Sequence, residues 1–170
     1  MAYVIGERPK WWRIILDFNE YGSIEASIST LATGLTTTFQ KSCIAKKIYD
    51  ALPIATEAIV IWDLEEEKEE KSRKQTRVPV ELLIKLPSRF RQKILRRDHT
   101  VKPGDVVYRP HIPAISIFVK DFEIYEPIEK IGHVRRAYMP NLYDIVEKTK
   151  NLASIYVEIR KAEIEVPEEE

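Results

Sequence analysis

The sequence predicts a mainly β protein that folds as one domain over residues 1–170, with two or three helices. Several short runs are either continuously apolar or alternate apolar and polar residues, and both patterns are typical of strands. Turn residues separate these runs, for example Pro103-Gly104-Asp105. A length of 170 residues, with 44% hydrophobic and 32% charged residues, is typical of a single globular domain.

The first part of the chain predicts a β-hairpin. Residues 11–18 are apolar at nearly every position, which predicts a buried strand. After a turn at 19–22, Ile24, Ala26 and Ile28 alternate with polar residues, which predicts a half-exposed strand. We therefore expect these two strands to pair.

A helix is predicted after the hairpin. Ile44 and Ile48 share one stripe at helical spacing, and either Thr38 or Ser42 can cap the N-terminus. Pro53 ends this helix because proline disfavours helical backbone in the residue before it.

The next two strands flank a highly charged segment. Residues 59–62 are all apolar, and residues 78–86 show the clearest apolar–polar alternation in the chain. Between them, residues 63–77 are almost all charged, acidic first and then basic. Because this composition cannot bury enough apolar surface to order itself, we expect a solvated, mobile hairpin loop.

A basic segment follows, in which Ser88 is expected to begin a short helix. Phe90 and Ile94 would face inward and the Arg and Lys residues outward. Such a strip can contact nucleic-acid phosphates. However, the formal net charge of the chain is 0, and no nucleic-acid motif is present. We therefore expect a solvated helix face and no nucleic-acid partner.

The last third of the chain predicts further strands and one more helix. The expected strands cover residues 106–109, 114–119, 124–134 and 155–166, and the expected helix covers 142–150. In the last strand the apolar positions change from odd to even numbers. Because a shift of one residue flips the buried face, we expect a bulge or break at Arg160-Lys161.

The order and spacing of these elements resembles a family of small prokaryotic cyclophilin-like proteins. The matching pieces are Ala45–Ile54, Glu57–Trp62, Val78–Ile84, Pro103–Pro110 (Pro-Gly-Asp-Val-Val-Tyr-Arg-Pro), Ala114–Phe118 and Pro127–Gly132. The resemblance implies a closed, eight-stranded β-barrel capped by helices. It places the barrel core at about residues 11–134 and leaves residues 135–170 as a helix–strand extension.

The chain departs from the family pattern at three places. Trp62 is followed by the charged segment rather than by a tight Trp-Gly turn, and Arg109 replaces a Trp before Pro110. The strand that ends in Phe-Phe-Gly in the family ends here in Phe118-Val119-Lys120. The Phe-His-Arg and Gln-Gly-Gly-Asp motifs of true cyclophilins are also absent. We therefore expect no prolyl-isomerase activity, although a divergent isomerase that uses Arg109 stays an alternative.

Five residues are candidates for binding a ligand at the barrel mouth. Tyr108, Arg109 and His111 combine an aromatic ring, a guanidinium and a titratable group between two strands. Trp62 and Phe118 are candidates for the floor of the same pocket. The simpler alternatives are that Arg109 pairs with a surface Glu, that His111 faces solvent, and that the aromatic residues belong to the core.

The sequence predicts neither a metal site nor a cofactor. His99, His111 and His133 lack the spacing of zinc ligands. The single cysteine, Cys43, excludes an internal disulfide and indicates a reducing, cytoplasmic location. No apolar run approaches the roughly 20 residues of a membrane span, so no membrane partner is expected. The high content of Ile, Lys and Glu is typical of a thermophilic source.

These observations favour a module that binds a small molecule or a peptide, without catalysing a reaction. The first alternative is a protein–protein or oligomerisation module that uses the charged loop 63–77 and the extension 135–170, with a homo-oligomer as one form of it. The second alternative is a divergent peptidyl-prolyl isomerase.

Overall fold

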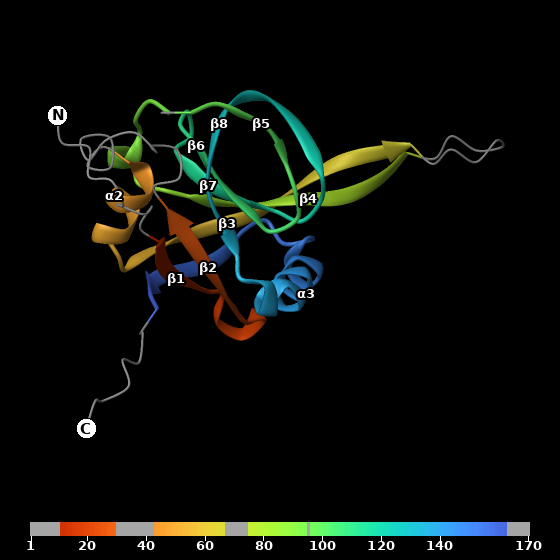
Figure 1. Cartoon of the computed structure of the whole chain (residues 1–170). Coiled ribbons are helices and arrows are strands. Elements are labelled where there is room, and N and C mark those ends of the chain that lie inside the picture. Colours follow the sequence, from red (N-terminus) through yellow and green to blue (C-terminus); the bar gives the residue numbers. More distant parts are fainter. Residues whose placement is uncertain (1–10, 30–42, 67–74, 95, 163–170) are drawn as a thin grey trace.

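The fold is an antiparallel β-barrel of eight strands with one extra strand outside it (Figure 1). The structure is a computed structural model that describes residues 11–29, 43–66, 75–94 and 96–162. The strands in these residues are β1 (Trp11–Asp17), β2 (Ser23–Ser29), β3 (Ile54–Glu66), β4 (Gln75–Lys85), β5 (Asp98–Val101), β6 (Asp105–Arg109), β7 (Ala114–Phe118), β8 (Phe122–Val134) and β9 (Ile155–Lys161). They are ordered β2-β1-β9-β3-β4-β7-β6-β8-β5.

A pairing between β2 and β8 closes the barrel and leaves β5 outside it. At this seam the two strands approach closely, with Ile28 opposite Gly132. A Cβ atom on Gly132 would lie 2.0 Å from the carbonyl oxygen of Ser27, so closure requires glycine here. The mainly β class and the closed, eight-stranded barrel that the sequence analysis predicted are confirmed.

In the described residues two α-helices pack on the barrel, together with three short 3₁₀ turns at Asn19–Tyr21, Ser88–Phe90 and Arg136–Tyr138. Helix α2 (Ile44–Asp50) begins after Cys43, while the expected caps Thr38 and Ser42 lie outside the described residues. Helix α3 (Met139–Thr149) begins earlier than expected, with Pro140 in its first turn, where proline is well tolerated. No helix in the described parts of the chain is long and apolar enough to cross a membrane.

The C-terminal helix–strand unit is present, and its strand is part of the barrel wall rather than an addition to it. Strand β9 lies between β1 and β3, so that Ile159 faces both Leu16 and Ile54. Its apolar residues Val157 and Ile159 are fully buried, as the inner face of a barrel strand requires. The strand ends at Lys161, within the predicted break.

Two apolar clusters lie on opposite faces of the sheet. The larger cluster fills the barrel and includes Val106 and Tyr108. The smaller one lies outside the barrel and is formed by residues from β4 to β8, namely Val80, Val101, Val107, Phe118, Ile124 and Ile128. Strand β6 therefore contributes side chains to both clusters, as the period-two geometry of a strand requires.

Strands β3 and β4 extend beyond the barrel as a two-stranded arm (Figure 1). They pair with each other out to Glu66 and Gln75, whereas β9 pairs with β3 only over Ile54–Ala58. The expectation of a loop over residues 63–77 is thus wrong at both ends, and residues 67–74 lie outside the described part. Backbone pairing in the arm needs no apolar surface, which is why composition alone missed it.

The helix that was expected to begin at Ser88 is a single 3₁₀ turn. Phe90 is buried as predicted, but Arg91 has extended backbone and residues 91–94 form no helix. The Gln92 amide donates a hydrogen bond to the hydroxyl of Tyr108 at 2.9 Å. The Gln92 amide therefore bonds to a distant side chain and not to a carbonyl oxygen one turn earlier, as it would in a helix. Ile94 is partly buried against the core.

Candidate functional site

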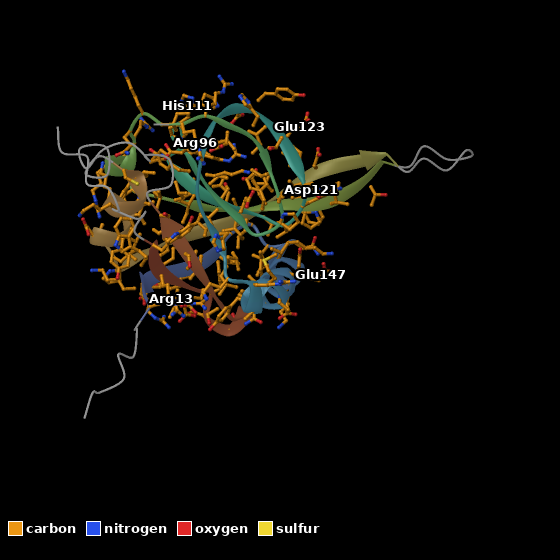
Figure 2. The ribbon with its side chains drawn as sticks, viewed as in Figure 1. Arg13, Arg96, His111, Asp121, Glu123 and Glu147 are labelled. Carbon is orange, nitrogen blue, oxygen red and sulfur yellow. The ribbon has the colours of Figure 1, made fainter. Side chains whose placement is uncertain are left out.

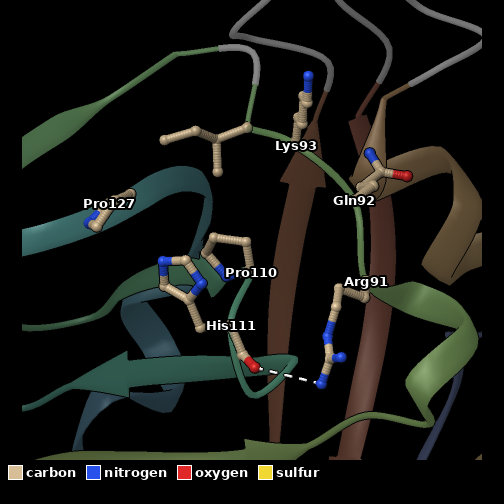
Figure 3. Close-up of a pocket in the computed structure, with 7 residues that line it drawn as sticks. Arg91, Gln92, Lys93, Pro110, His111 and Pro127 are labelled. Carbon is tan, nitrogen blue, oxygen red and sulfur yellow. Dashed lines mark hydrogen bonds between the residues drawn. The ribbon is translucent and has the colours of Figure 1, made fainter.

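A groove of about 530 Å³ opens beside the loop that joins β6 to β7 (Figure 3). Its volume falls within the range of roughly 300–1,000 Å³ that is typical of ligand pockets. Three parts of the chain line it, and their residues are Arg91, Gln92, Lys93, Ile94, Pro110, His111 and Pro127. We take this groove as the candidate site.

The hydroxyl of Tyr108 holds one wall of the groove in place. It donates a hydrogen bond to the carbonyl oxygen of Phe90 at 2.5 Å and accepts one from the Gln92 amide at 2.9 Å. The side chain is fully buried in the barrel core, and this burial raises the pKa of the Tyr108 phenol. A core residue of β6 thus fixes the backbone from which the first wall is built.

Arg91 links the two walls directly. Its Nη2 atom donates to the carbonyl oxygen of His111 at 3.4 Å (Figure 3) and to that of Ile112, also at 3.4 Å. The loop is also attached to the barrel, because the Leu86 amide donates to the Pro113 carbonyl oxygen at 3.0 Å. The groove is therefore formed before any ligand arrives, which reduces the entropic cost of binding.

The lining combines apolar surface with positive charge. Pro110, Pro127 and Ile94 are half-buried, whereas Arg91 and Lys93 are exposed. Within the described residues, neither Arg91 nor Lys93 forms an ion pair with a carboxylate. Such a groove suits a ligand that carries negative charge beside an apolar surface.

On the opposite face of β6, Arg109 lies in a network of hydrogen-bonded ion pairs. Its guanidinium donates twice to the buried carboxylate of Glu81, at 2.7 and 3.1 Å. It also donates to Ser116 Oγ at 3.2 Å and to the exposed carboxylate of Glu126 at 3.1 Å. Arg109 therefore pairs with glutamates, as the simpler alternative proposed, although its main partner is buried rather than on the surface.

The five residues singled out from the sequence do not meet in one place. The Arg109 guanidinium lies 5.9 Å from the centre of the Phe118 ring, so these two are neighbours in the outer layer. His111 lines the groove, and Tyr108 lies behind it in the core. Trp62 is at the base of the arm, where its Nε1 donates to the Lys150 carbonyl oxygen at 3.2 Å.

Most of the groove was not recognised from the sequence. The segment that supplies Arg91 and Lys93 was interpreted as a solvated helix face, and the prolines were interpreted only as loop or edge markers. Two features of the sequence could have indicated the groove, namely the titratable His111 directly after Pro110 and the run of Arg and Lys residues at 89–97. The sequence does not reveal that this run lies against the loop.

The other reactive side chains offer no second centre. In the parts of the chain that the structure describes, no group of three or more His, Cys, Asp or Glu is arranged to hold a metal ion. Cys43 is buried, and this burial raises the pKa of its thiol, which disfavours the reactive thiolate.

Comparisons with known proteins place the fold but not the activity. No family model matches the chain, and no curated protein matches it. The hypothetical protein AF2241 from Archaeoglobus fulgidus has a similar solution structure, with a TM-score of 0.55, 19% identity, and coverage of 93% of this chain and 100% of that chain. McbB, solved in complex with tryptophan, has a TM-score of 0.62 and 16% identity over 90% of this chain.

The chain spans only 46% of the length of McbB. At these identities the likeness shows a shared fold alone. Neither comparison names a cyclophilin-like protein, so that family remains a proposal.

Proposed function

We propose that this barrel protein is a cyclophilin-like binding module whose groove takes a small ligand or a peptide with negative charge beside an apolar surface. The observation that carries the proposal is the lining of the groove. Arg91 and Lys93 supply charge with no carboxylate partner among the described residues, and Pro110 and Pro127 supply apolar walls. The buried Cys43 fits a reducing compartment, and we propose a cytoplasmic location.

We propose that binding occurs without prolyl isomerisation. The barrier to rotation about a peptide bond is roughly 18–20 kcal/mol, so a catalyst must place a donor at the prolyl nitrogen. Arg109 was the candidate donor, but Glu81, Ser116 and Glu126 already accept its hydrogen bonds. We expect no acceleration of cis–trans exchange in a proline-containing test peptide, and a clear acceleration would favour the divergent isomerase instead.

An aromatic carboxylate is a suitable first probe of the groove. Its carboxylate can accept from Arg91, and its ring can lie against Pro110 and Pro127. Tryptophan, present in the McbB structure, has this combination of groups, and so does indole-3-acetate. The latter lacks an ammonium group that would meet the positive wall, so we expect it to bind more tightly.

Calorimetric titration of indole-3-acetate tests the proposal. Lys93→Glu should weaken binding by about tenfold, equivalent to about 1.4 kcal/mol, because it reverses an exposed charge in the lining. Lys148→Glu on α3 is the matched control and should leave affinity unchanged. Figure 2 shows that the neighbouring Glu147 lies on a different side of the molecule from His111. Equal affinities for both variants would contradict the proposal.

The protruding arm supports a second candidate, a protein-interaction module. A two-stranded arm is marginally stable alone, and its unpaired edges can accept another strand. Strand β9 pairs with β3 over Ile155–Ile159 and with β1 over Glu158–Lys161, so both of its edges are paired at Glu158 and Ile159. Light scattering of the full chain and of a variant with a shortened arm tests this candidate. The candidate requires the full chain to be an oligomer and the shortened variant to be a monomer.

A further inference from the structure

Two segments that line the groove each carry a large apolar side chain in solvent, close in the sequence to a lining residue. Ile112, in the loop that supplies His111, is 45% exposed, and Tyr125, on β8 close to Pro127, is 82% exposed. Isolated apolar residues on a surface are common, but two of them beside one groove are typical of an interaction surface. A small ligand inside the groove would leave both uncovered.

Tyr125 is held in this exposed position by an irregularity in β8. Asp98 of β5 faces Ile128, but Thr100 faces Glu123, so residues 124–127 of β8 bulge out opposite a single residue of β5. Arg97 fixes the bulge by donating from Nη2 to the Tyr125 carbonyl oxygen at 2.6 Å. Bulges re-aim side chains, and this one directs the Tyr125 ring into solvent.

The charges around the groove are unbalanced. Within the described residues Arg91, Lys93 and Arg97 form no ion pair with a carboxylate. Of the exposed carboxylates on this part of β8, Glu126 pairs with Arg109, and Glu123 accepts a hydrogen bond from the Tyr125 hydroxyl at 3.5 Å. This surface therefore presents positive charge beside apolar side chains, and its complement is a surface with negative charge between apolar groups.

The openness of the groove also favours an extended partner. A pocket for a small molecule typically encloses 70–90% or more of the surface of its ligand. Here one wall is a segment without regular secondary structure, residues 91–94, which begins in extended backbone at Arg91, and the other is the short loop at 110–111 (Figure 3). A chain in extended conformation can lie along the first wall and reach both Ile112 and Tyr125.

We infer that the occupant of this groove is an extended acidic peptide segment of another protein, whose aliphatic side chains contact Ile112 and Tyr125 and whose carboxylates face Arg91, Lys93 and Arg97. This inference rests on the proposed function of the groove and narrows it to one class of ligand.

Fluorescence anisotropy tests the inference with the full chain and a short labelled peptide in which Glu alternates with Val or Ile. The acidic peptide should bind, and raising the salt from about 50 mM to about 500 mM should weaken it by about tenfold or more. A peptide with Lys in place of each Glu should not bind.

Two variants locate the binding, and two controls match them. Lys93→Glu and Tyr125→Ser should each weaken the acidic peptide by about tenfold. Lys148→Glu and Tyr143→Ser change the same residue types at exposed positions of α3 and should have no effect. Circular dichroism of each variant shows whether the fold is retained, so that loss of binding is not confused with unfolding.

The results of these experiments distinguish this inference from the more general proposal that the groove binds a small ligand or a peptide. Binding of indole-3-acetate without binding of the acidic peptide would overturn the inference and leave the proposed function intact. Peptide binding that neither variant changes would show that this surface is not the site. Preference for single-stranded DNA over the acidic peptide would also overturn it. If neither probe binds, both proposals are wrong.

Discussion

Two adjacent residues of strand β6 point to opposite faces of the sheet and show how differently those faces treat polar groups. Tyr108 enters the barrel core, where only its hydroxyl is polar and the backbone of Phe90 and Gln92 satisfies it. Arg109 enters the outer layer, where Glu81 neutralises its charge. The inner face therefore contains a single hydrogen-bonded hydroxyl group, whereas the outer face contains a buried ion pair.

The comparison has a functional consequence. The inner residue fixes the wall at Phe90–Gln92, and the outer residue lies directly before Pro110 and His111 and fixes the start of the other wall. Neither side chain lines the groove, yet both hold its geometry. Substitutions on the outer face should therefore lower the free energy of unfolding most, those on the inner face less, and those at an exposed ion pair least.

Removal of the buried carboxylate should have the largest effect on stability. Glu81→Ala leaves the Arg109 guanidinium, whose side chain is only 11% exposed, without its main partner. We expect a loss of about 3–5 kcal/mol in the free energy of unfolding, because a largely buried charge keeps only the exposed carboxylate of Glu126 as its ionic partner. Urea denaturation measures it.

A double variant separates charge from packing. Glu81→Ala combined with Arg109→Met should recover much of that loss, because no unpaired charge then remains in the layer. A double variant as unstable as the sum of the two single variants would contradict the account.

Removal of the phenol hydroxyl should have a moderate effect on the inner face. Tyr108→Phe leaves the Gln92 amide and the Phe90 carbonyl without their partner, and we expect a loss of about 1–2 kcal/mol. Hydrogen exchange should show faster exchange at the Gln92 amide. Tyr143→Phe, on an exposed ring, is the control, and unchanged protection of Gln92 would show that the hydroxyl does not hold the wall.

The same phenol predicts how stability depends on alkaline pH. Burial raises the pKa of Tyr108 above the ordinary value of 10.0, so the unfolded chain releases this proton first. The free energy of unfolding should therefore fall as pH rises above about 10 and through the pKa of the folded state. Urea midpoints between about pH 8 and pH 11 should fall less steeply in Tyr108→Phe than in the wild type, and parallel curves would contradict the assignment.

The exposed ion pair at the seam between β1 and β9 should have the smallest effect. Asp17 and Arg160 are 31% and 42% exposed and 2.8 Å apart, so Asp17→Asn should cost no more than about 1 kcal/mol. Arg160 lowers the pKa of Asp17, so this contribution is present above about pH 4 and is lost as pH falls further. A loss comparable to that of Glu81→Ala would remove the contrast between buried and exposed pairs.

The strands were largely predictable because their pattern is local. Period-two alternation placed Leu82 and Ile84 on the inner face, and the buried odd positions of β9 follow the same rule. The position of β9 between β1 and β3 was not predictable, since the resemblance ends at residue 134 and sequence distance does not set strand order.

The site was less predictable because its partners are distant in sequence. Arg109 meets Glu81 only because β7 lies between β4 and β6. Phe90 and Ile94 have helical spacing, but the hydrogen bond from the Gln92 amide to the Tyr108 hydroxyl takes the place of a helical one. Both contacts form only in the complete barrel, and local sequence patterns carry no information on which distant residues the barrel brings together.

The central claim is that the groove between residues 91–94 and the loop at 110–113 is the binding site of this protein. Two-dimensional NMR of the labelled full chain during titration with indole-3-acetate tests it most directly, because every amide reports its own position. The account predicts saturable shifts at Gln92, Lys93 and His111, with Tyr143 on α3 unmoved. Saturable shifts confined to the arm or to α3, with the groove amides unchanged, would contradict it.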